Sequence, residues 1–306
     1  MRILTTIVGG LANVGMILLV APLAQGVLEE ITARIQSRQG PPLLQPYFDL
    51  LKLLGKEDIE SGEFPLMQRF ATYLSLAAVL TVACLVPMGF AAPMTGAGDV
   101  ILLIYLLTVC GISTLLAGLA AGSTYSLLGI SREMMTMIAL EPLFAIAIVV
   151  GALHTGSLGL DAVLHGSVWI SSGIPWSGLI MLVLMFLAFQ AFVQRVPFDI
   201  PEAETELMEG PLMEYSGPKL AMFKYAQMAK LIIYGALFVT LFVPWGSGLL
   251  FPVGWLLFWA KVFALVLLVT LVAATHARYR IDQAVRIFAG FIGIAFVALV
   301  LATYGH

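Results

Sequence analysis

Eight apolar stretches, each about as long as a bilayer-crossing helix, constrain the fold of this chain more than any other feature. A helix needs about 20 mostly apolar residues to cross the hydrocarbon core of a membrane. Because lipid cannot hydrogen-bond an exposed backbone, each stretch is expected to be a transmembrane helix. The stretches are Ile3–Leu28, Phe70–Phe90, Val100–Ala121, Met134–Leu153, Ile174–Val193, Ala221–Trp245, Pro252–Thr275 and Ile287–Tyr304.

The composition supports the same class. Hydrophobic residues make up 60% of the 306 residues and charged residues only 11%, whereas a soluble protein carries about 25% charged residues. We therefore expect an all-α polytopic membrane protein with one integral membrane domain over residues 1–306. The net charge of −3 is too small to suggest a nucleic-acid partner. Cys84 and Cys110 lie in apolar runs, so neither a disulfide frame nor an iron–sulfur site is expected.

Basic residues fall almost entirely in alternate connections. The connections after the odd-numbered stretches, counted with their helix-end residues, hold 13 of the 15 Lys and Arg, and the even connections hold none. Positively charged connections stay on the cytoplasmic side of a membrane. We therefore predict that the odd connections are cytoplasmic and that both termini lie outside.

The first odd connection predicts a short amphipathic helix on the membrane surface. Its residues at helical spacing are Leu44, Tyr47, Leu51 and Leu54. Asp49, Lys52 and Lys56 occupy the other faces. The helix is interpreted as an interfacial anchor, as a docking surface for a soluble partner with Arg34 and Arg38 as contacts, or as both.

The third odd connection concentrates acids, since six of the 18 lie between Asp199 and Glu214. Pro201 suits the first turn of a helix, and Gly210 followed by Pro211 is a stop signal. A short acidic helix is therefore predicted within the 195–220 loop, over residues 201–209.

The acids of this predicted helix are Glu202, Glu204, Glu206 and Glu209. Three of them share one face, and Glu204 points elsewhere. One interpretation is a solvated acidic face. The other is a functional cluster, because carboxylates crowded at a wet–apolar boundary titrate as a unit and can pass protons.

Two ionisable residues lie within predicted spans and at nearly the same depth. Glu141 follows Arg132 by nine residues, and Lys261 follows Pro252 by nine. An uncompensated charge at that depth costs about 3 kcal/mol or more. The two residues either form a buried salt bridge that fixes helix packing or are stations on a charge path.

Several charged motifs resemble a known family. Residues 195–217 resemble the signature of the membrane subunit that anchors the peripheral arm of respiratory complex I and of energy-converting nickel–iron hydrogenases. The matching motifs elsewhere are Arg34-Ile-Gln-Ser-Arg38-Gln-Gly-Pro, Asp49-Leu-Leu-Lys52, Ser131-Arg132-Glu133 with Glu141-Pro142, and Lys261 followed by Arg278-Tyr-Arg280-Ile-Asp282-Gln. The resemblance covers the whole chain and its helix count.

The residues of these motifs are more similar to those of the hydrogenase branch of the family, which includes the formate hydrogenlyases. Only Pro42-Leu43-Leu44 separates Gly-Pro from Gln-Pro in the first loop, which is longer in complex I members. Glu141-Pro142 also stands where those members usually have Glu-Val-Pro. The alternatives are the quinone-site subunit of a complex I-type NADH:quinone oxidoreductase and a stand-alone ion transporter. Transporters usually show repeated halves, and none is visible here.

The resemblance implies a non-catalytic subunit of the prokaryotic cytoplasmic membrane that anchors a peripheral arm and couples its redox chemistry to ion movement. Nickel–iron and iron–sulfur centres would lie in partners, namely hydrogenase large and small subunits and iron–sulfur subunits, with antiporter-like subunits alongside in the bilayer. No cofactor, metal ligand or catalytic residue is expected in this chain, and a quinone only in the complex I alternative. The implied ion-coupling residues are Asp199, Glu202, Glu204, Glu206, Glu209, Glu214 and Glu141, to which we add Lys261. The implied arm contacts and charge network are Arg34, Arg38, Asp49, Lys52, Arg278, Arg280 and Asp282.

Overall fold

The chain is a bundle of helices in a computed structural model that describes residues 2–59, 64–89, 94, 96, 98–170, 174–201, 208, 210–246, 249 and 252–305. The α-helices are α1 (Arg2–Ile35), α2 (Gln45–Leu54), α3 (Pro65–Leu85), α4 (Val100–Ala121), α5 (Thr124–Thr155), α6 (Leu160–Val163), α7 (Trp176–Phe192), α9 (Gly217–Phe242), α10 (Val253–Thr275) and α11 (Ile281–Thr303). Two 3-10 turns, η2 (Ser167–Trp169) and η3 (Gly210–Leu212), complete the described elements. The prediction of an all-α membrane protein is confirmed.

Seven of these helices are long and apolar enough to cross a membrane, and the shorter apolar helix α7 corresponds to the remaining predicted stretch, Ile174–Val193. The predicted and observed bounds agree best at α4 and differ most at α5, which begins ten residues before Met134. Its N-cap is Ser123, whose hydroxyl accepts a hydrogen bond from the Ser126 backbone N–H at 3.2 Å. Hydropathy locates the apolar part of a helix, whereas caps and polar contacts set its ends.

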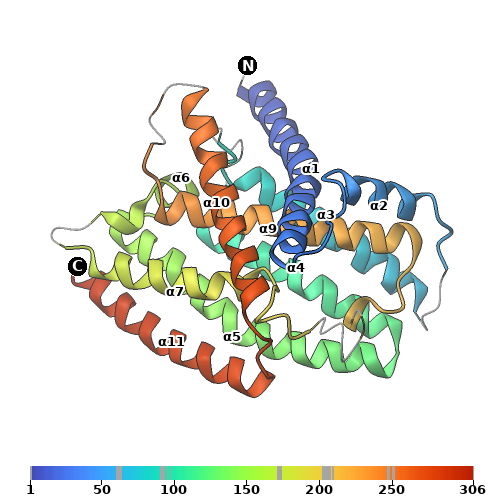
Figure 1. Ribbon diagram of the computed structural model, residues 1–306. Coiled ribbons are helices and arrows are strands. Elements are labelled where there is room, and N and C mark those ends of the chain that lie inside the picture. Colours follow the sequence, from blue (N-terminus) through green and yellow to red (C-terminus); the bar gives the residue numbers. More distant parts are fainter. Residues whose placement is uncertain are drawn as a thin grey trace.

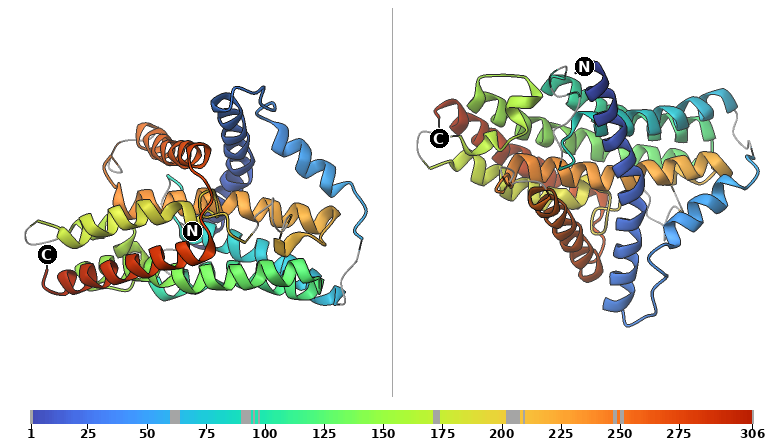
Figure 2. Two further views of the ribbon diagram at one scale, coloured as in Figure 1. Left: turned by 60° about the horizontal axis from the view of Figure 1, so that its bottom comes forward. Right: turned by 90° about the horizontal axis from the view of Figure 1, so that it is seen from above.

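Helix α9 lies at the centre of the bundle and contacts α1, α2, α3, α7 and α10. In its most apolar window 72% of the residues are buried, against 22% in α11. Helices α5, α7 and α11 pack side by side, whereas α1 and α10 cross α9 (Figures 1 and 2). The outer face of α11 is therefore left for lipid or for neighbouring subunits.

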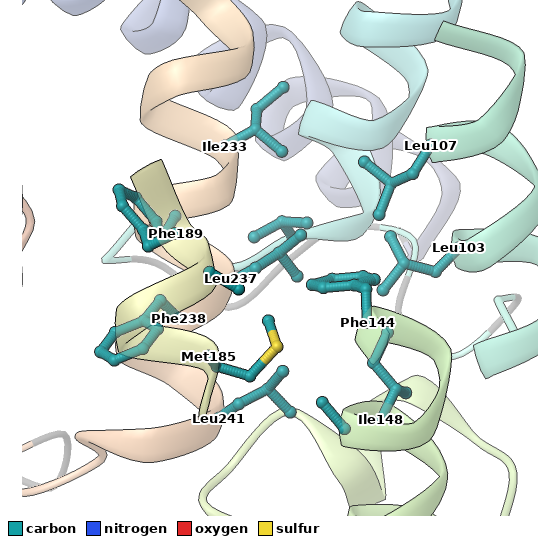
Figure 3. Packing of buried hydrophobic residues seen from close by; sticks show 14 of the residues in the cluster. Leu103, Leu107, Phe144, Ile148, Met185, Phe189, Ile233, Leu237, Phe238 and Leu241 are labelled. Carbon is teal, nitrogen blue, oxygen red and sulfur yellow. The ribbon is translucent and has the colours of Figure 1, made fainter. Parts of the chain in front are cut away.

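The main hydrophobic core lies where α4, α5, α7 and α9 meet (Figure 3). Phe144 of α5 packs edge-on against Phe192 of α7 and Tyr234 of α9, with ring centroids 5.5 and 5.9 Å apart. The residues of this core that Figure 3 labels are Leu103, Leu107, Phe144, Ile148, Met185, Phe189, Ile233, Leu237, Phe238 and Leu241. This core fixes the end of α7 against α5 and α9, which positions the polar site described below.

The predicted surface helix is present as α2 and packs against α1 and α9. The residues that it buries are Pro46 and Leu50. Much of the predicted apolar stripe faces outward, since Leu51 is 65% exposed. An outward apolar stripe at the side of a membrane bundle agrees with contact to lipid.

The predicted acidic helix over 201–209 lies almost entirely outside the described residues, which include only residues 201 and 208 of it. The segment that follows it is firmly attached to α4 and α5. Ser126 donates hydrogen bonds to the Gly118 and Pro211 carbonyls at 2.9 and 3.3 Å, and the Tyr215 hydroxyl donates to the Ala117 carbonyl at 2.9 Å. Burial raises the pKa of Tyr215, so its hydroxyl remains a hydrogen-bond donor.

Replacing Gly129 of α5 should destabilise this attachment. A Cβ there would lie 2.8 Å from Pro211 Cδ and 2.9 Å from Pro211 N. Gly129→Ala is expected to lower the free energy of unfolding by about 1–3 kcal/mol, because overpacking forces the backbone to move. In a background without the partly exposed Cys84, unfolding can be followed with a thiol-reactive fluorophore that reaches the buried Cys110 only when the bundle opens.

The matched control is Gly290→Ala in α11, where a Cβ meets nothing within 4 Å. That change should be neutral or stabilise by up to about 1 kcal/mol. Equal melting temperatures for the two variants would contradict the close packing of α5 on η3.

Candidate functional site

A large cavity of about 700 Å³ opens among the polar ends of α1, α2, α7 and α9. Helix α2 contributes Asp49 and Lys52, which recur on one helical face together with Lys56 beyond its end. The cavity thus brings together four residues that the sequence predicted as contacts or coupling groups: Asp49, Lys52, Asp199 and Arg278.

The described lining of this cavity carries more positive than negative side chains. The acids are Glu29, Asp49 and Asp199, and the bases are Lys52, Lys56, Arg195, Lys224, Lys230 and Arg278. Six basic and three acidic side chains leave a surplus of three positive charges on these residues. Such a wall attracts anionic groups and acidic segments.

Residues 194–201, which follow α7, form one wall of the cavity and are tied to several helices. Arg195 donates a hydrogen bond to the Gln25 side chain of α1, and Arg278 pairs with Asp199 at 2.7 Å. Gln190 donates to the Val196 carbonyl at 3.0 Å and to the Val269 carbonyl of α10 at 2.7 Å. These contacts hold the start of the acidic connection in one place.

A second, smaller cavity of about 70 Å³ lies deeper in the bundle and contains two carboxylates. Glu133 and Glu141 both project into it from α5, where eight residues separate them by about two turns or 12 Å. Glu133 is only 3% exposed. Gln194 donates to its two carboxylate oxygens at 2.7 and 2.9 Å. A volume of this size holds a few water molecules.

The two cavities share part of their walls. Phe192, Gln194 and Lys230 line both. The Lys230 ammonium lies 3.5 Å from the Cys110 carbonyl and close enough to Glu133 for an electrostatic interaction. A chain of polar groups thus leads from the large cavity past Gln194 to Glu133 and on to Glu141.

Other predicted site residues lie away from both cavities. Arg34 pairs with Glu30 on α1 and is exposed, as is Arg38. Arg280 and Asp282, 3.7 Å apart, are exposed at the start of α11. Glu214 is half-buried beyond η3, and Glu202, Glu204, Glu206 and Glu209 lie outside the described residues.

The suggested salt bridge between Glu141 and Lys261 is not present, and that interpretation is wrong. The Lys261 ammonium donates to the Val243 carbonyl at 2.8 Å and to the Trp245 carbonyl, both just beyond α9. It lines a separate cavity of about 320 Å³ beside α10. The carbonyls at a helix end lack partners within the helix, so they attract the ammonium and replace the expected carboxylate.

The sequence is similar to a defined family along almost all of its length. A family profile described as NADH dehydrogenase matches residues 9–303. The chain belongs to this NADH dehydrogenase subunit 1-like family. The resemblance read from the charged motifs is thereby confirmed.

Similar proteins come from hydrogenase and complex I systems. Formate hydrogenlyase subunit 4 of Escherichia coli (strain K12) is 36% identical over 296 residues, which cover 92% of this chain and 94% of that protein. Hydrogenase-4 component C of the same strain is 34% identical, covering 79% and 77%. A membrane subunit of the NADH-quinone oxidoreductase of Geobacter metallireducens is 32% identical, covering 89% and 86%.

A solved structure confirms the fold. A chain of the membrane-bound sulfane sulfur reductase, an archaeal respiratory membrane complex, superposes with a TM-score of 0.86. The match covers 97% of this chain and 99% of that chain at 24% identity. At this identity the likeness establishes the architecture alone.

Sequence reasoning missed Glu133, Gln194 and Lys230 as members of the site. One signal was available, because Glu133 and Glu141 are eight residues apart and therefore share a helix face. Gln194 and Lys230 carried no such signal, since their positions depend on how α7 and α9 pack against α5.

The ion pair between Asp199 and Arg278 should be the main electrostatic support of the cavity wall. Its side chains are 14% and 24% exposed. Asp199→Asn is expected to lower the free energy of unfolding by about 2–3 kcal/mol, because it leaves the Arg278 charge poorly solvated. The midpoint of thermal unfolding in detergent measures the effect.

The control is Asp282→Asn, which breaks the exposed pair with Arg280, whose side chains are 67% and 82% exposed. Exposed pairs contribute less than about 1 kcal/mol. If Asp282→Asn lowered the midpoint of thermal unfolding more than Asp199→Asn, the less exposed ion pair would not be the stronger of the two.

Proposed function

We propose that the chain is the non-catalytic membrane subunit of a membrane-bound nickel–iron hydrogenase complex, coupling electron transfer in a peripheral arm to proton or sodium translocation. The observation that carries the proposal is the pair of cavities joined at Gln194 and Lys230. They lead from a charged opening to a carboxylate inside a membrane-spanning helix. Family membership and the relatives named as hydrogenlyase and hydrogenase components support it.

The route proposed for the ions begins at the acidic connection. Asp199 lies on the wall of the large cavity, and the acids Glu202, Glu204, Glu206, Glu209 and Glu214 follow it in sequence. Glu133 and Glu141 continue the route into the bundle. Carboxylates spaced along a wet path can exchange protons or respond to charge in the large cavity.

The peripheral arm is proposed to dock over the opening of the large cavity. Asp49 and Lys52 supply exposed charge on the cavity wall, and Arg34, Arg38, Arg280 and Asp282 supply exposed charge outside the cavity. The hydrogenase large and small subunits and the iron–sulfur subunits would hold the nickel–iron and iron–sulfur centres. Antiporter-like subunits would pack against the exposed flanks of the bundle.

The second candidate is a quinone-site subunit of a complex I-type enzyme. The large cavity favours it, because about 700 Å³ suffices for a bulky organic ligand. The similarity to NADH-quinone oxidoreductase subunits also supports it.

Purification of the complex through a tag on this chain separates the two candidates. A hydrogenase complex should co-purify with stoichiometric nickel and no quinone. Bound quinone without nickel would establish the second candidate. Ion transport by the isolated chain in liposomes would contradict both and favour a stand-alone transporter.

In the proposed orientation, the odd connections face the cytoplasm of a prokaryotic cell and both termini lie outside. The variant Ser37→Cys, in a background without Cys84 and Cys110, should react with an impermeant maleimide only from the cytoplasmic side. The variant Leu158→Cys, in an even connection, should react only from outside. Labelling of each variant from the opposite side would show that the proposed orientation is wrong.

Glu204→Gln or Glu206→Gln should reduce ion translocation while leaving assembly and artificial-donor hydrogenase activity nearly intact. Removing these charges interrupts the proposed route but leaves the metal centres of the arm in place. The measurement compares ion uptake by vesicles with dihydrogen turnover. Glu57→Gln, at an exposed acid that lines neither cavity, serves as the control. Equal loss of translocation and turnover would assign these acids a structural role.

A further inference from the structure

The second residue after α7 has a backbone conformation that its residue type rarely adopts. Gln194 has φ of 55°, in the left-handed region. The Gln194 and Arg195 N–H groups donate to the Ala191 and Gln190 carbonyls, both at 3.1 Å. This is the Schellman ending of a helix, whose left-handed position usually holds glycine because a Cβ is crowded there. The chain therefore keeps a side chain where glycine would be less strained.

The side-chain amide nitrogen of Gln194 donates to both oxygens of Glu133, at 2.7 and 2.9 Å. Glu133 is 3% exposed, so its carboxylate is shielded from bulk solvent. A buried carboxylate without donors would be strongly destabilised, and the amide supplies them. Local strain at Gln194 is thus offset by a contact with another helix.

Gln194 also lies at the junction of the site. It lines both the large and the small cavity, next to Lys230. The residues after it are bound to α1 through Arg195 and to Arg278 through Asp199. A shift of this segment would move the Gln194 amide relative to Glu133.

We propose that Gln194 is a positioning residue that clamps the Glu133 carboxylate at the passage between the two cavities, and that its strained backbone is retained for this purpose. The proposal rests on the proposed function for the ion route through Glu133. The clamp itself rests on contacts in this chain alone. Two measurements therefore test the clamp and the route separately.

The first measurement compares Gln194→Gly in two backgrounds by thermal unfolding of the complex. With Glu133 present, the change should lower the melting temperature by about 3 °C or more, because it removes the donors of a buried carboxylate. In a Glu133→Leu background the same change should raise the melting temperature, since only the relief of backbone strain remains. Glu133→Met, which also lacks an acceptor for the Gln194 amide, gives the same comparison if the leucine variant does not fold. An equal shift in both backgrounds overturns the clamp.

Ser37 provides a matched control for the backbone. It has φ of 57° in the same Schellman ending, where the Ser37 and Arg38 N–H groups donate to the Arg34 and Ala33 carbonyls. Ser37 lies on an exposed segment away from both cavities. Ser37→Gly should raise the melting temperature or leave it unchanged, whichever residue stands at position 133.

The second measurement is the number of ions moved per electron in the reconstituted complex, with proton and sodium uptake recorded separately. Gln194→Gly should lower this ratio about tenfold, because a shift of a reacting group by about 1 Å can cost up to a hundredfold. Electron transfer to an artificial acceptor should stay within about twofold of the wild type, and Ser37→Gly should leave both unchanged.

The outcomes separate the inference from the proposed function. If both Glu133→Gln and Gln194→Gly lower the ratio of ions to electrons, the result supports the ion route through Glu133 and the positioning role of Gln194. A lowered ratio in Glu133→Gln alone overturns the positioning role. An unchanged ratio in both variants refutes the proposed route, and with it the role of Gln194 in ion transfer, even if the stability measurement still detects the clamp.

Discussion

Lipid offers no solvation to charge, and three ionisable side chains inside the spans show how the bundle holds such groups. Glu133 receives two hydrogen bonds from Gln194. The Lys230 ammonium lies against the Cys110 carbonyl, and Lys261 binds the carbonyls beyond the end of α9. Each contact joins a helix to another helix or to a connecting segment. Solvating the charge therefore also fixes the packing.

Helix α9 mediates most of these constraints because it is central and the most buried of the spans. Its Lys224 and Lys230 side chains line the large cavity, and the carbonyls just beyond its C-terminal end accept hydrogen bonds from Lys261. A helix that contacts five others cannot shift without moving the cavity walls. The electrostatic site and the hydrophobic core are thus parts of one structure.

The same membrane fold can occur in complexes that are named for different reactions. Relatives named for formate hydrogenlyase, hydrogenase and NADH-quinone oxidoreductase align over most of this chain. A fold does not determine a reaction, and under the proposed function the redox centres lie in other subunits. The features that this chain contributes are an opening with surplus positive charge, an acidic connection and a buried path that ends at a carboxylate.

The sequence by itself determined the membrane class, the eight apolar helices, the surface helix α2 and the family, because hydropathy and charged motifs are local properties of the chain. It also identified Asp49, Lys52, Asp199, Arg278 and Glu141, which line the two cavities. Only the tertiary structure decided the partners of the buried charges. Glu133 meets Gln194 across 61 residues of sequence, and Lys261 binds helix-end carbonyls where Glu141 was expected. Such pairings depend on the rotation and crossing of packed helices, which no local pattern in the sequence encodes.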